Sequence, residues 1–464
     1  MYSSYSSLQQ SQLAAQGYYD TQSTYLLVYA PGRSTALRAT LADQLHRKFR
    51  LADTLGSALT EGVDGVLLVS EDVECMSTAL MCFAKALQDG ADYAVCNAVF
   101  GFGGATALYQ SRAHLAQNRC ALVSRPLLER CRAAAKDPEN VTELLALAAQ
   151  FCAHPARIPQ ALLHYERDIC AEDAFSATGK RAFLMSHVLD MTGAPIVLVS
   201  AVPVLRSMGY EVVVLGPSDG GALQLFVDAG AAVITRPGIR ATPNLWGLAL
   251  CTDLVLVNTV VMARTVRALS GTAVPVLWWL HDAFAGYPHI AHQIPTQLGE
   301  NVRVYSVGSH AANAMRAVRP EFEIRPLIYG LPDYAAENFV RTDLGYNRGR
   351  PLFATVGSFE RRKGHDIFCK AIRLLPPEVR EKASFLFVGQ AADKEMMDSV
   401  RALTADYPEN VYYCKRLTRD EIKSLMEQCT GLVCASRDDP MPTFVTEGLI
   451  FGKPSIVSEH TGPA

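Results

Sequence analysis

The sequence predicts an α/β protein of several domains, on two observations. Short apolar runs of β-type residues alternate with helical patterns along most of the chain, which is typical of parallel sheets covered by helices on both faces. The chain has 464 residues, of which 49% are apolar and 19% charged. At roughly 100–200 residues per domain this length indicates about three domains, each with a core of its own.

The charge and cysteine content exclude several classes of protein. With 43 basic and 46 acidic side chains the formal net charge is −3, so the chain lacks the basic field that nucleic-acid binding needs. Its 12 cysteines are scattered, without a C-x-x-C pair, as is usual for thiols in a reducing compartment. The N-terminus has no signal-peptide pattern, and the longest nearly apolar run, 194–205, is too short to span a bilayer. We expect a cytoplasmic protein with at most peripheral membrane association.

The first third of the chain predicts a tail, a domain and a linker. Residues 1–24 are rich in Ser, Gln and Tyr and predict a disordered tail. A domain is expected over 25–168, with strands at 25–30 and 66–70 and amphipathic helices between and after them. The small, polar and acidic stretch at 169–181 is interpreted as a linker.

The rest of the chain predicts two Rossmann-like domains in series, at 182–345 and 346–464. Ligands are expected at the carboxyl ends of their parallel strands. The predicted strands lie at 182–186, 211–215, 253–258, 275–280, 302–307, 352–356, 384–388, 411–414 and 431–435.

The segment 436–462 contains two carboxylates near a predicted helix start. Thr443 is expected to be the N-cap of that helix, which Gly452 ends. A helix N-terminus at a strand end favours a phosphate or diphosphate. Asp439 and Glu447, with seven residues between them, are placed to accept hydrogen bonds from a sugar and a ribose on either side of the diphosphate. The alternative is a solvated loop acid and a first-turn acid stabilised by the helix dipole.

A second segment, VGSFERRKG at 356–364, places three cations at a helix start. Cations are unfavourable there, which favours an anionic ligand. Arg362 and Lys363 could neutralise a leaving diphosphate; the alternative is a solvated basic loop.

Two further strand ends carry candidate residues. Gly193 precedes a helix expected from Pro195 and would allow close approach of a phosphate, although a G-x-G-x-x-G fingerprint is absent. His281, in WWLHD, follows a predicted strand and could contact a substrate hydroxyl, or could be an ordinary strand-end histidine.

Together these segments resemble the family-4 retaining glycosyltransferases of the GT-B fold, over residues 182–464. The resemblance is carried by SHVLDMTGAP, DLVLVNT, WWLHD, YGLPD, VGSFERRKG, FLFVGQ and the segment 436–462. The family usually writes its acidic pair E-x7-E, where this chain has Asp439 and Glu447. The resemblance also makes the domain at 346–464 look truncated, because the final helices of such a domain are missing.

The resemblance implies a role for each candidate residue. Glu447 would hold the donor ribose, Asp439 the hydroxyls of the donor sugar, and His281 the transferred sugar. Ser358 stands where the family often has Arg, which leaves more of the phosphate binding to Arg362 and Lys363. His281 and Asp439 are the expected catalytic residues, and the expected donor-binding residues are Gly193, Ser358, Arg362, Lys363, Thr443, Phe444 and Glu447. The implied reaction needs no metal, and the leaving phosphate helps to deprotonate the acceptor hydroxyl.

The first domain resembles a family-2, GT-A glycosyltransferase that is shortened. In VDGVLLVSEDVE at 63–74, Glu71 and Asp72 would form the metal-diphosphate motif, and His164 would be a third ligand for Mn or Mg. Glu139 and Asn140 stand where that family has its catalytic acid pair, and an amide is no general base. A degenerate, non-catalytic domain is the alternative.

The sequence therefore predicts a retaining glycosyltransferase that moves a sugar from a nucleotide-diphosphate sugar to a glycan or lipid-linked acceptor, in cell-envelope polysaccharide biosynthesis. The first alternative is a non-catalytic carbohydrate- or partner-binding scaffold built from truncated glycosyltransferase modules. The second, a nucleotide-sugar epimerase of the same fold, is disfavoured by the basic loop and the acidic pair.

Overall fold

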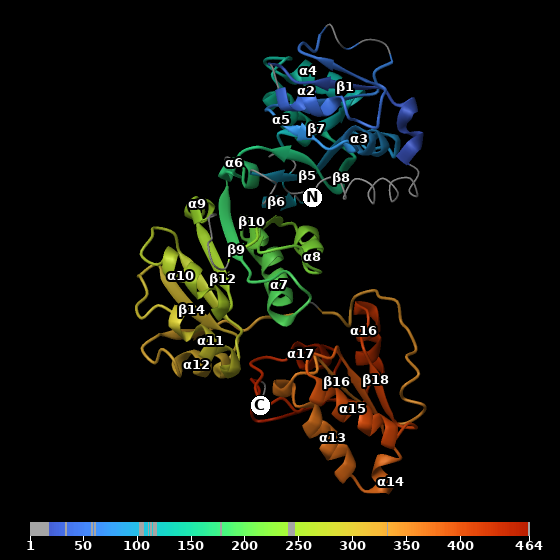
Figure 1. The fold of residues 1–464 in the computed structure, drawn as a ribbon, viewed down its shortest axis with the longest axis vertical. Helices are drawn as coiled ribbons and strands as arrows, with labels where there is room; N and C mark the ends of the chain where they lie inside the picture. Colours follow the sequence, from blue (N-terminus) through green and yellow to red (C-terminus); the bar gives the residue numbers. More distant parts are fainter. Residues whose placement is uncertain are drawn as a thin grey trace. The chain divides into compact units, whose positions relative to one another are not determined.

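The computed structural model of the protein describes residues 18–32, 35–56, 59, 62–101, 106–109, 111, 114, 118–176, 179–239, 246–331 and 333–462. The chain divides into two compact units, Met1–Met191 with Ala201–Val255, and Thr192–Ser200 with Leu256–Ala464. Figure 1 shows the helices and strands of both units. The division falls within helix α7 (Gly193–Ser207) and strand β12 (Leu254–Asn258). Of the predicted tail, residues 1–17 lie outside the described residues, and Tyr18–Ser23 form a 3-10 helix, η1.

The first unit is built on one mixed sheet, in the order β9-β10-β11-β6-β5-β7-β3-β1-β2, with β8 paired to β5 and to β4. Strand β1 is parallel to β2 and β3, whereas β7 is antiparallel to β3 and β5, and β6 is antiparallel to β5. The strands are β1 (Leu26–Tyr29), β2 (Phe49–Ala52), β3 (Gly65–Val69), β4 (Glu74–Cys75), β5 (Tyr93–Phe100), β6 (Thr106–Tyr109), β7 (Cys120–Ser124), β8 (Pro155–Tyr165), β9 (Lys180–Met185), β10 (Tyr210–Gly216) and β11 (Ala232–Thr235).

The prediction of helices after residue 70 was incomplete, because β5, β6 and β7 lie there. Strand β5 is apolar on both faces, so it lacks the alternation that distinguishes a strand from a buried helix. The helices of this unit are α2 (Thr35–Leu41), α3 (Ala79–Gln88), α4 (Arg125–Ala134), α5 (Val141–Phe151), α6 (Ala171–Ala174), α8 (Leu223–Asp228) and α9 (Trp246–Leu250). Apolar side chains of β1, β3, β5 and β7 form a core with α4 and α5.

Pairing between β6 and β11 joins the N-terminal strands to β9, β10 and β11. The two strands are antiparallel, with Leu108 opposite Ile234. The predicted linker at 169–181 contributes helix α6 and the first residues of β9. The stretch between the two groups of strands is therefore itself partly helical and partly sheet.

The second unit contains two groups of parallel strands. One has the order β15-β14-β13-β12, and the other is a five-stranded sheet in the order β18-β17-β16-β19-β20. The strands of this unit are β12, β13 (Val276–Leu280), β14 (Val302–Ser306), β15 (Ile324–Pro326), β16 (Leu352–Val356), β17 (Ser384–Val388), β18 (Val411–Cys414), β19 (Gly431–Cys434) and β20 (Ser455–Val457).

The predicted α/β fold with two Rossmann-like sheets is confirmed. Every strand predicted from residue 182 onward is present, within two residues at each end. In β17, Phe385 and Phe387 pack on one side with α13 (His365–Leu374) and α15 (Lys394–Asp406). Leu386 and Val388 pack on the other side with α16 (Arg419–Gln428) and α17 (Thr443–Ile450). The five-stranded sheet is thus covered on both faces, as its continuous apolar strands indicate.

The helices of the second unit follow the strands in order. They are η3 (Val260–Met262), α10 (Ala263–Leu269), η4 (Phe284–Gly286), α11 (Tyr287–Ile290), η5 (Ala291–Gln293), α12 (Ser309–Arg316), η6 (Arg361–Lys363), α13 (His365–Leu374), α14 (Pro377–Arg380), α15 (Lys394–Asp406), α16 (Arg419–Gln428) and α17 (Thr443–Ile450). The expectation that Thr443 caps the last helix was wrong: Pro442 occupies the N-cap position, and Thr443 is the first helical residue. The expected stop is confirmed, since Gly452 has φ of +68° just after the helix.

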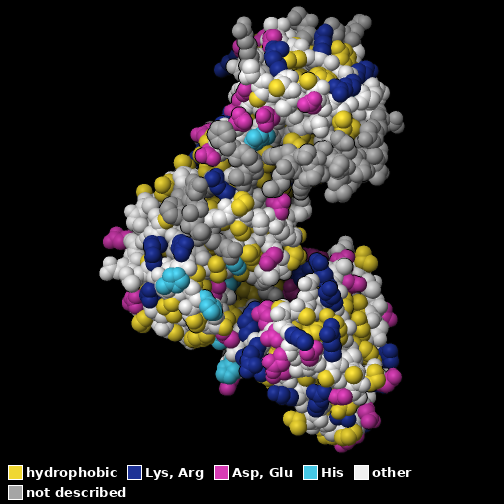
Figure 2. Space-filling view, viewed as in Figure 1, with side chains coloured by type: hydrophobic (Ala, Val, Ile, Leu, Met, Phe, Trp, Pro, Cys, Tyr) yellow, Lys and Arg dark blue, Asp and Glu magenta, His cyan; other side chains and the backbone are white. Residues whose placement is uncertain are grey.

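The surface is mixed in charge. On the face shown in Figure 2, acidic and basic side chains are interspersed over the second unit, in keeping with the net charge of −3. No helix among the described residues is both long and apolar enough to cross a membrane.

The backbone just after β17 lies very close to the backbone just after β16, and this contact leads to a prediction about stability. A Cβ at Gly389, just after β17, would lie 1.9 Å from the backbone oxygen of Gly357. Gly389→Ala should therefore lower the free energy of unfolding by at least about 2 kcal/mol, because backbone must move. The control is Gly330→Ala, whose Cβ would have nothing within 4 Å. Urea unfolding of both variants checks this, and equal stabilities would contradict it.

Candidate functional site

Two loops meet at the carboxyl edge of the five-stranded sheet. One, 357–364, follows β16, and the other, 435–442, follows β19. A Cβ at Gly364 would lie 1.9 Å from the backbone oxygen of Ala435, and Gly364 has φ of +68°. Glycine is therefore required where the loops touch.

Arg437 fastens the second loop to the first. Its backbone N–H donates to the Arg362 carbonyl at 2.7 Å, and its guanidinium makes two hydrogen bonds of 2.8 Å to the Asp366 carboxylate. These hydrogen bonds lower the pKa of Asp366 below its usual value. The contact fixes the basic loop relative to the acidic one.

Lys363 and Asp439 form the central ion pair of the site. Lys363 Nζ lies 2.5 Å from Asp439 Oδ2, and the two side chains are 18% and 6% exposed. A cation predicted to neutralise the diphosphate is thus in direct contact with the carboxylate predicted to bind the donor sugar. The pairing offsets the cost of burying the Asp439 carboxylate.

Glu360, which the sequence analysis passed over, holds two of the expected phosphate-binding side chains. Arg362 Nε donates to its Oε2 at 2.8 Å, and Ser358 Oγ donates to its Oε1. Burial raises the pKa of Glu360, but these hydrogen bonds and the nearby cations outweigh it, so the pKa is lowered. The sequence signal that could have indicated this role is the acidic residue directly before three consecutive cations.

Glu447 is also paired. It is 7% exposed, and its Oε1 accepts a hydrogen bond of 2.7 Å from Arg419 Nη1. Arg419 Cζ lies 4.4 Å from the centroid of the Tyr334 ring. Neither Arg419 nor Tyr334 was predicted, since 28 residues separate Arg419 from its partner and no spacing rule relates them.

The first turn of α17 lies beside Gly193, which is the first residue of α7, two residues before the expected helix start at Pro195. A Cβ at Gly193 would be 3.7 Å from Thr443 Cγ2, so these two expected donor-binding residues are neighbours within the second unit. Phe444 is 7% exposed and packs in the core of the five-stranded sheet. Any contact of Phe444 with a donor would therefore come from its backbone.

His281 follows β13 in an aromatic and acidic setting. Its ring centroid lies 4.6 Å from that of Trp279 and 6.5 Å from that of Tyr329. The adjoining Asp282 accepts a hydrogen bond of 2.6 Å from the Val260 N–H, and burial raises its pKa to about 6. A perturbed carboxylate at a strand end is a feature of functional sites that the sequence did not indicate.

The end of β12 carries a strained residue near that position. Thr259 has φ of +73°, which is rare for a β-branched residue, and its carbonyl accepts a hydrogen bond of 2.8 Å from Trp278 Nε1. The preceding Asn258 donates its Nδ2 to the Ala194 carbonyl at 3.1 Å. Asn258 thereby ties the end of β12 to the start of α7.

Asp438 links the two parallel sheets of the second unit. Its carboxylate accepts hydrogen bonds from the backbone N–H groups of Phe284 and Ala285, at 3.2 and 2.8 Å, and lies 2.7 Å from His310 Nε2. Nearby, Tyr329 Oη donates to the Met441 carbonyl at 3.3 Å. The acidic loop therefore contacts the side of the unit that carries His281.

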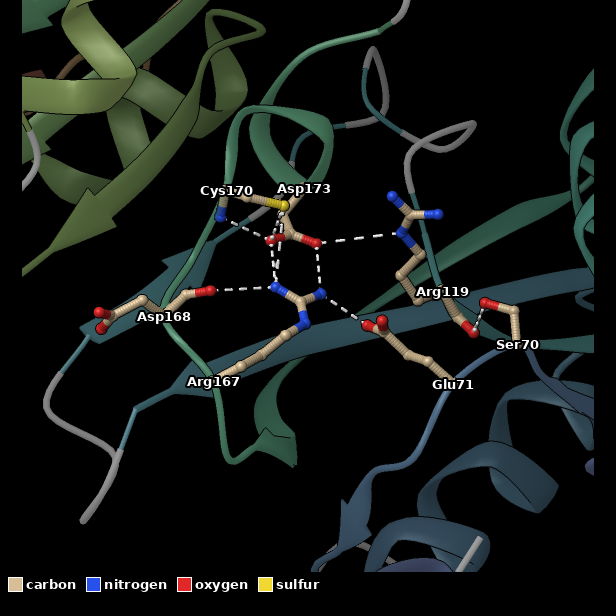
Figure 3. Close-up of polar contacts among 7 residues, drawn as sticks. All are labelled: Ser70, Glu71, Arg119, Arg167, Asp168, Cys170 and Asp173. Carbon is tan, nitrogen blue, oxygen red and sulfur yellow. Dashed lines mark hydrogen bonds and ion pairs between the residues drawn. The ribbon is translucent and has the colours of Figure 1, made fainter. Parts of the chain in front are cut away.

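In the first unit, the acidic motif after β3 is bound by an arginine (Figure 3). Arg167 Nη2 lies 2.6 Å from Glu71 Oε1, and the same guanidinium makes two hydrogen bonds to Asp173, at 2.7 and 2.8 Å. Asp173 is 4% exposed. Burial raises the pKa of Asp173, but its hydrogen bonds from Arg167 and Cys170 outweigh this, so the pKa is lowered.

The other expected metal ligands have separate partners. His164 Nδ1 lies 2.7 Å from Glu74 Oε2 and its Nε2 lies 2.9 Å from the Gly101 carbonyl. Asp72 Oδ1 accepts a hydrogen bond of 3.4 Å from Leu37 N. Among the described residues, no three His, Cys, Asp or Glu side chains are grouped so as to hold a metal. The predicted ligands Glu71, Asp72 and His164 are thus not brought together for Mn or Mg.

The residues at the expected catalytic acid pair have structural contacts. Asn140 Oδ1 caps α5 by accepting from Glu143 N at 3.0 Å. Glu139 accepts hydrogen bonds from the N–H groups of Leu55 and Gly56, at 2.6 and 2.9 Å. Both side chains thus serve the local fold.

Two family models match the chain in succession. Residues 178–318 match glycosyl-transferase family 4, and residues 337–464 match glycosyl transferases group 1. They cover the parts that contain Gly193 and His281, and then the basic loop and acidic pair. Together with a site that contains paired cations and carboxylates, these matches identify the chain as a glycosyltransferase.

Solved structures give weaker likenesses. HepE (Alr3699) of Anabaena, crystallised with UDP and glucose, is 15% identical over 61% of this chain and 82% of its own, with a TM-score of 0.48. A UDP-forming trehalose-phosphate synthase of Burkholderia xenovorans is 12% identical over 61% and 85%, with a TM-score of 0.45. WaaG, a glycosyltransferase of lipopolysaccharide biosynthesis, is 16% identical over 61% and 82%, with a TM-score of 0.45. The sequence matches no curated protein.

The Arg167 contact gives a prediction about stability and its pH dependence. Arg167→Met should destabilise the first unit by about 2 kcal/mol at pH 7, because it leaves the buried Asp173 carboxylate without its main partner. The lowered pKa of Asp173 means that its contribution is present at neutral pH and is lost as the pH falls through its folded pKa. The difference from the unaltered protein should therefore shrink in acid.

Hydrogen-exchange mass spectrometry of β3 and β8 peptides, from pH 7 down to the acid limit of the fold, measures this difference. The control is Arg325→Met, which removes an ion pair to Glu323 whose side chains are 52% and 75% exposed and should change nothing measurable. A loss that did not vary with pH would contradict the role given to Asp173.

Proposed function

We propose that the protein is a retaining glycosyltransferase of the GT-B type, which transfers a sugar from a nucleotide-diphosphate sugar to a glycan or lipid-linked acceptor. The observation that carries the proposal is the meeting of the basic loop and the acidic pair at one sheet edge. Lys363 there contacts Asp439, and the first turn of α17 lies beside Gly193, with Glu447 one turn further along that helix. Cations, carboxylates and a helix N-terminus together suit a donor that has a diphosphate between two polyols.

The charged groups have distinct roles in this reaction. Lys363 and Arg362 neutralise the diphosphate as it leaves, and charge neutralisation of the leaving group is the main electrostatic demand of the transfer. Asp439 accepts hydrogen bonds from the donor sugar and Glu447 from the ribose. The leaving phosphate takes the proton of the acceptor hydroxyl on the same face, and these steps use no metal.

In this proposal the ends of β12 and β13 form the acceptor side of the site. His281, beside Asp282 at the end of β13, would contact the transferred sugar. The strained Thr259 is supported from the neighbouring strand by Trp278. Strain held in place by surrounding structure is compatible with a preorganised substrate pocket.

The N-terminal strands form, in this proposal, a shortened GT-A-like domain that does not catalyse transfer. Arg167 supplies the positive charge beside Glu71, and Asn140 is a helix cap. We extend the proposal to cell-envelope polysaccharide biosynthesis in the cytoplasm, with peripheral membrane contact at most. A non-catalytic scaffold is disfavoured, because both halves of the proposed enzyme match glycosyltransferase models.

Substitution of the paired charges tests the function. Lys363→Ala and Glu447→Ala should each reduce turnover of the donor by roughly 100-fold or more, since each removes a charged contact that strengthens in the transition state. The measurement is release of nucleoside diphosphate from a panel of UDP- and GDP-sugars with isolated glycan acceptors.

Matched controls are Arg401→Ala and Glu409→Ala, whose side chains are 69% and 80% exposed and which should leave turnover unchanged. Thermal unfolding of all four variants verifies that each is folded. Release of nucleoside diphosphate at the unaltered rate by both Lys363→Ala and Glu447→Ala would refute the assignment.

A further inference from the structure

Arg419 places a positive charge at the N-terminal end of a helix, where such a charge is unfavourable. It is the first residue of α16, where Thr418 is the N-cap and Glu421 completes a capping box. The N-terminal end of a helix dipole repels a positive charge. The carboxylate that compensates it is not on α16 but on α17: Arg419 Nη1 lies 2.7 Å from Glu447 Oε1.

The guanidinium is held from a second side by an aromatic ring. Arg419 Cζ lies 4.4 Å from the centroid of Tyr334, and Lys423, one turn further along α16, has its Nζ 5.4 Å from the same ring. Lys423 is itself fixed by an ion pair of 2.6 Å to Glu337. Burial raises the pKa of Tyr334, so the ring is neutral. Two cations on one face of α16 thus rest on one aromatic platform.

The ion pair with Arg419 strongly restricts the orientation of the Glu447 carboxylate. The Glu447 side chain is only 10% exposed, against 41% for Arg419, so the carboxylate is the more enclosed partner. A charge-assisted hydrogen bond to Oε1 fixes the plane of the carboxylate and the direction of Oε2. An ionised carboxylate only accepts hydrogen bonds, and a ribose 2′,3′-diol offers two donors.

We propose that Arg419 is a positioning residue for the donor ribose: it holds Oε1 of Glu447 so that the carboxylate is aligned with the ribose diol, and Tyr334 fixes Arg419 in turn. This inference rests on the proposed function, in which Glu447 binds the ribose. Recognition of a ribonucleotide then depends on three residues: Tyr334 in the 333–345 segment, Arg419 at the start of α16, and Glu447 in α17.

The test compares nucleotides with and without the diol. Isothermal titration with UDP and GDP, and with their 2′,3′-dideoxy counterparts, is performed on the full chain and on Arg419→Gln. Removal of a hydrogen bond between charged groups should weaken binding of the preferred ribonucleotide roughly 10- to 100-fold. The dideoxy counterpart should bind both proteins with the same, already weak, affinity.

Three variants separate positioning from a general loss of structure. Arg419→Lys, which retains the charge, should restore part of the affinity for the ribonucleotide. Tyr334→Leu should weaken ribonucleotide binding in the same selective manner but to a smaller extent. Arg416→Gln makes the same kind of change three residues earlier and should have no effect on either nucleotide.

Two outcomes would overturn the inference, and they are distinguishable. Equal weakening of the ribonucleotide and its dideoxy counterpart by Arg419→Gln would mean that Arg419 acts on the phosphates or on the fold, while the proposed function stands. Absence of binding of UDP and GDP to the unaltered protein would remove the proposed function and this inference with it.

Discussion

The candidate donor site depends on the close approach of two backbones at the edge of the five-stranded sheet. Gly364 lies so near the Ala435 carbonyl that no side chain fits between them. This approach brings the loops after β16 and β19 together, and it allows Lys363 to reach Asp439. A charged site is thus assembled from segments about seventy residues apart by a contact in which neither charge takes part.

Charge compensation is the second principle of the site. Lys363 is paired with Asp439, Arg362 with Glu360, and Arg419 with Glu447. Each of these three cations therefore has a carboxylate partner, which lets a basic loop exist in a chain of net charge −3. The same principle is used in the first unit, where Arg167 lies between Glu71 and Asp173.

The features that could be predicted from the sequence are those with a local signal. Continuous apolar runs located the parallel strands, and Gly452 located the end of α17. Strand β5 was missed because its nearly continuous apolar run lacks the alternation of a half-buried strand. The ion pairs were missed for a different reason: the partners of Glu447 and Glu71 lie 28 and 96 residues away, and no periodicity relates such positions.

The pairing of β6 with β11 has a consequence for how the chain could be divided. The family match begins at residue 178, yet β11 has its outer edge covered by β6, a strand from well before that point. A chain beginning at 178 would expose the N–H and C=O groups along the edge of β11, and an uncovered edge strand is a template for association with other chains. The N-terminal strands therefore supply the cover for the edge of β11.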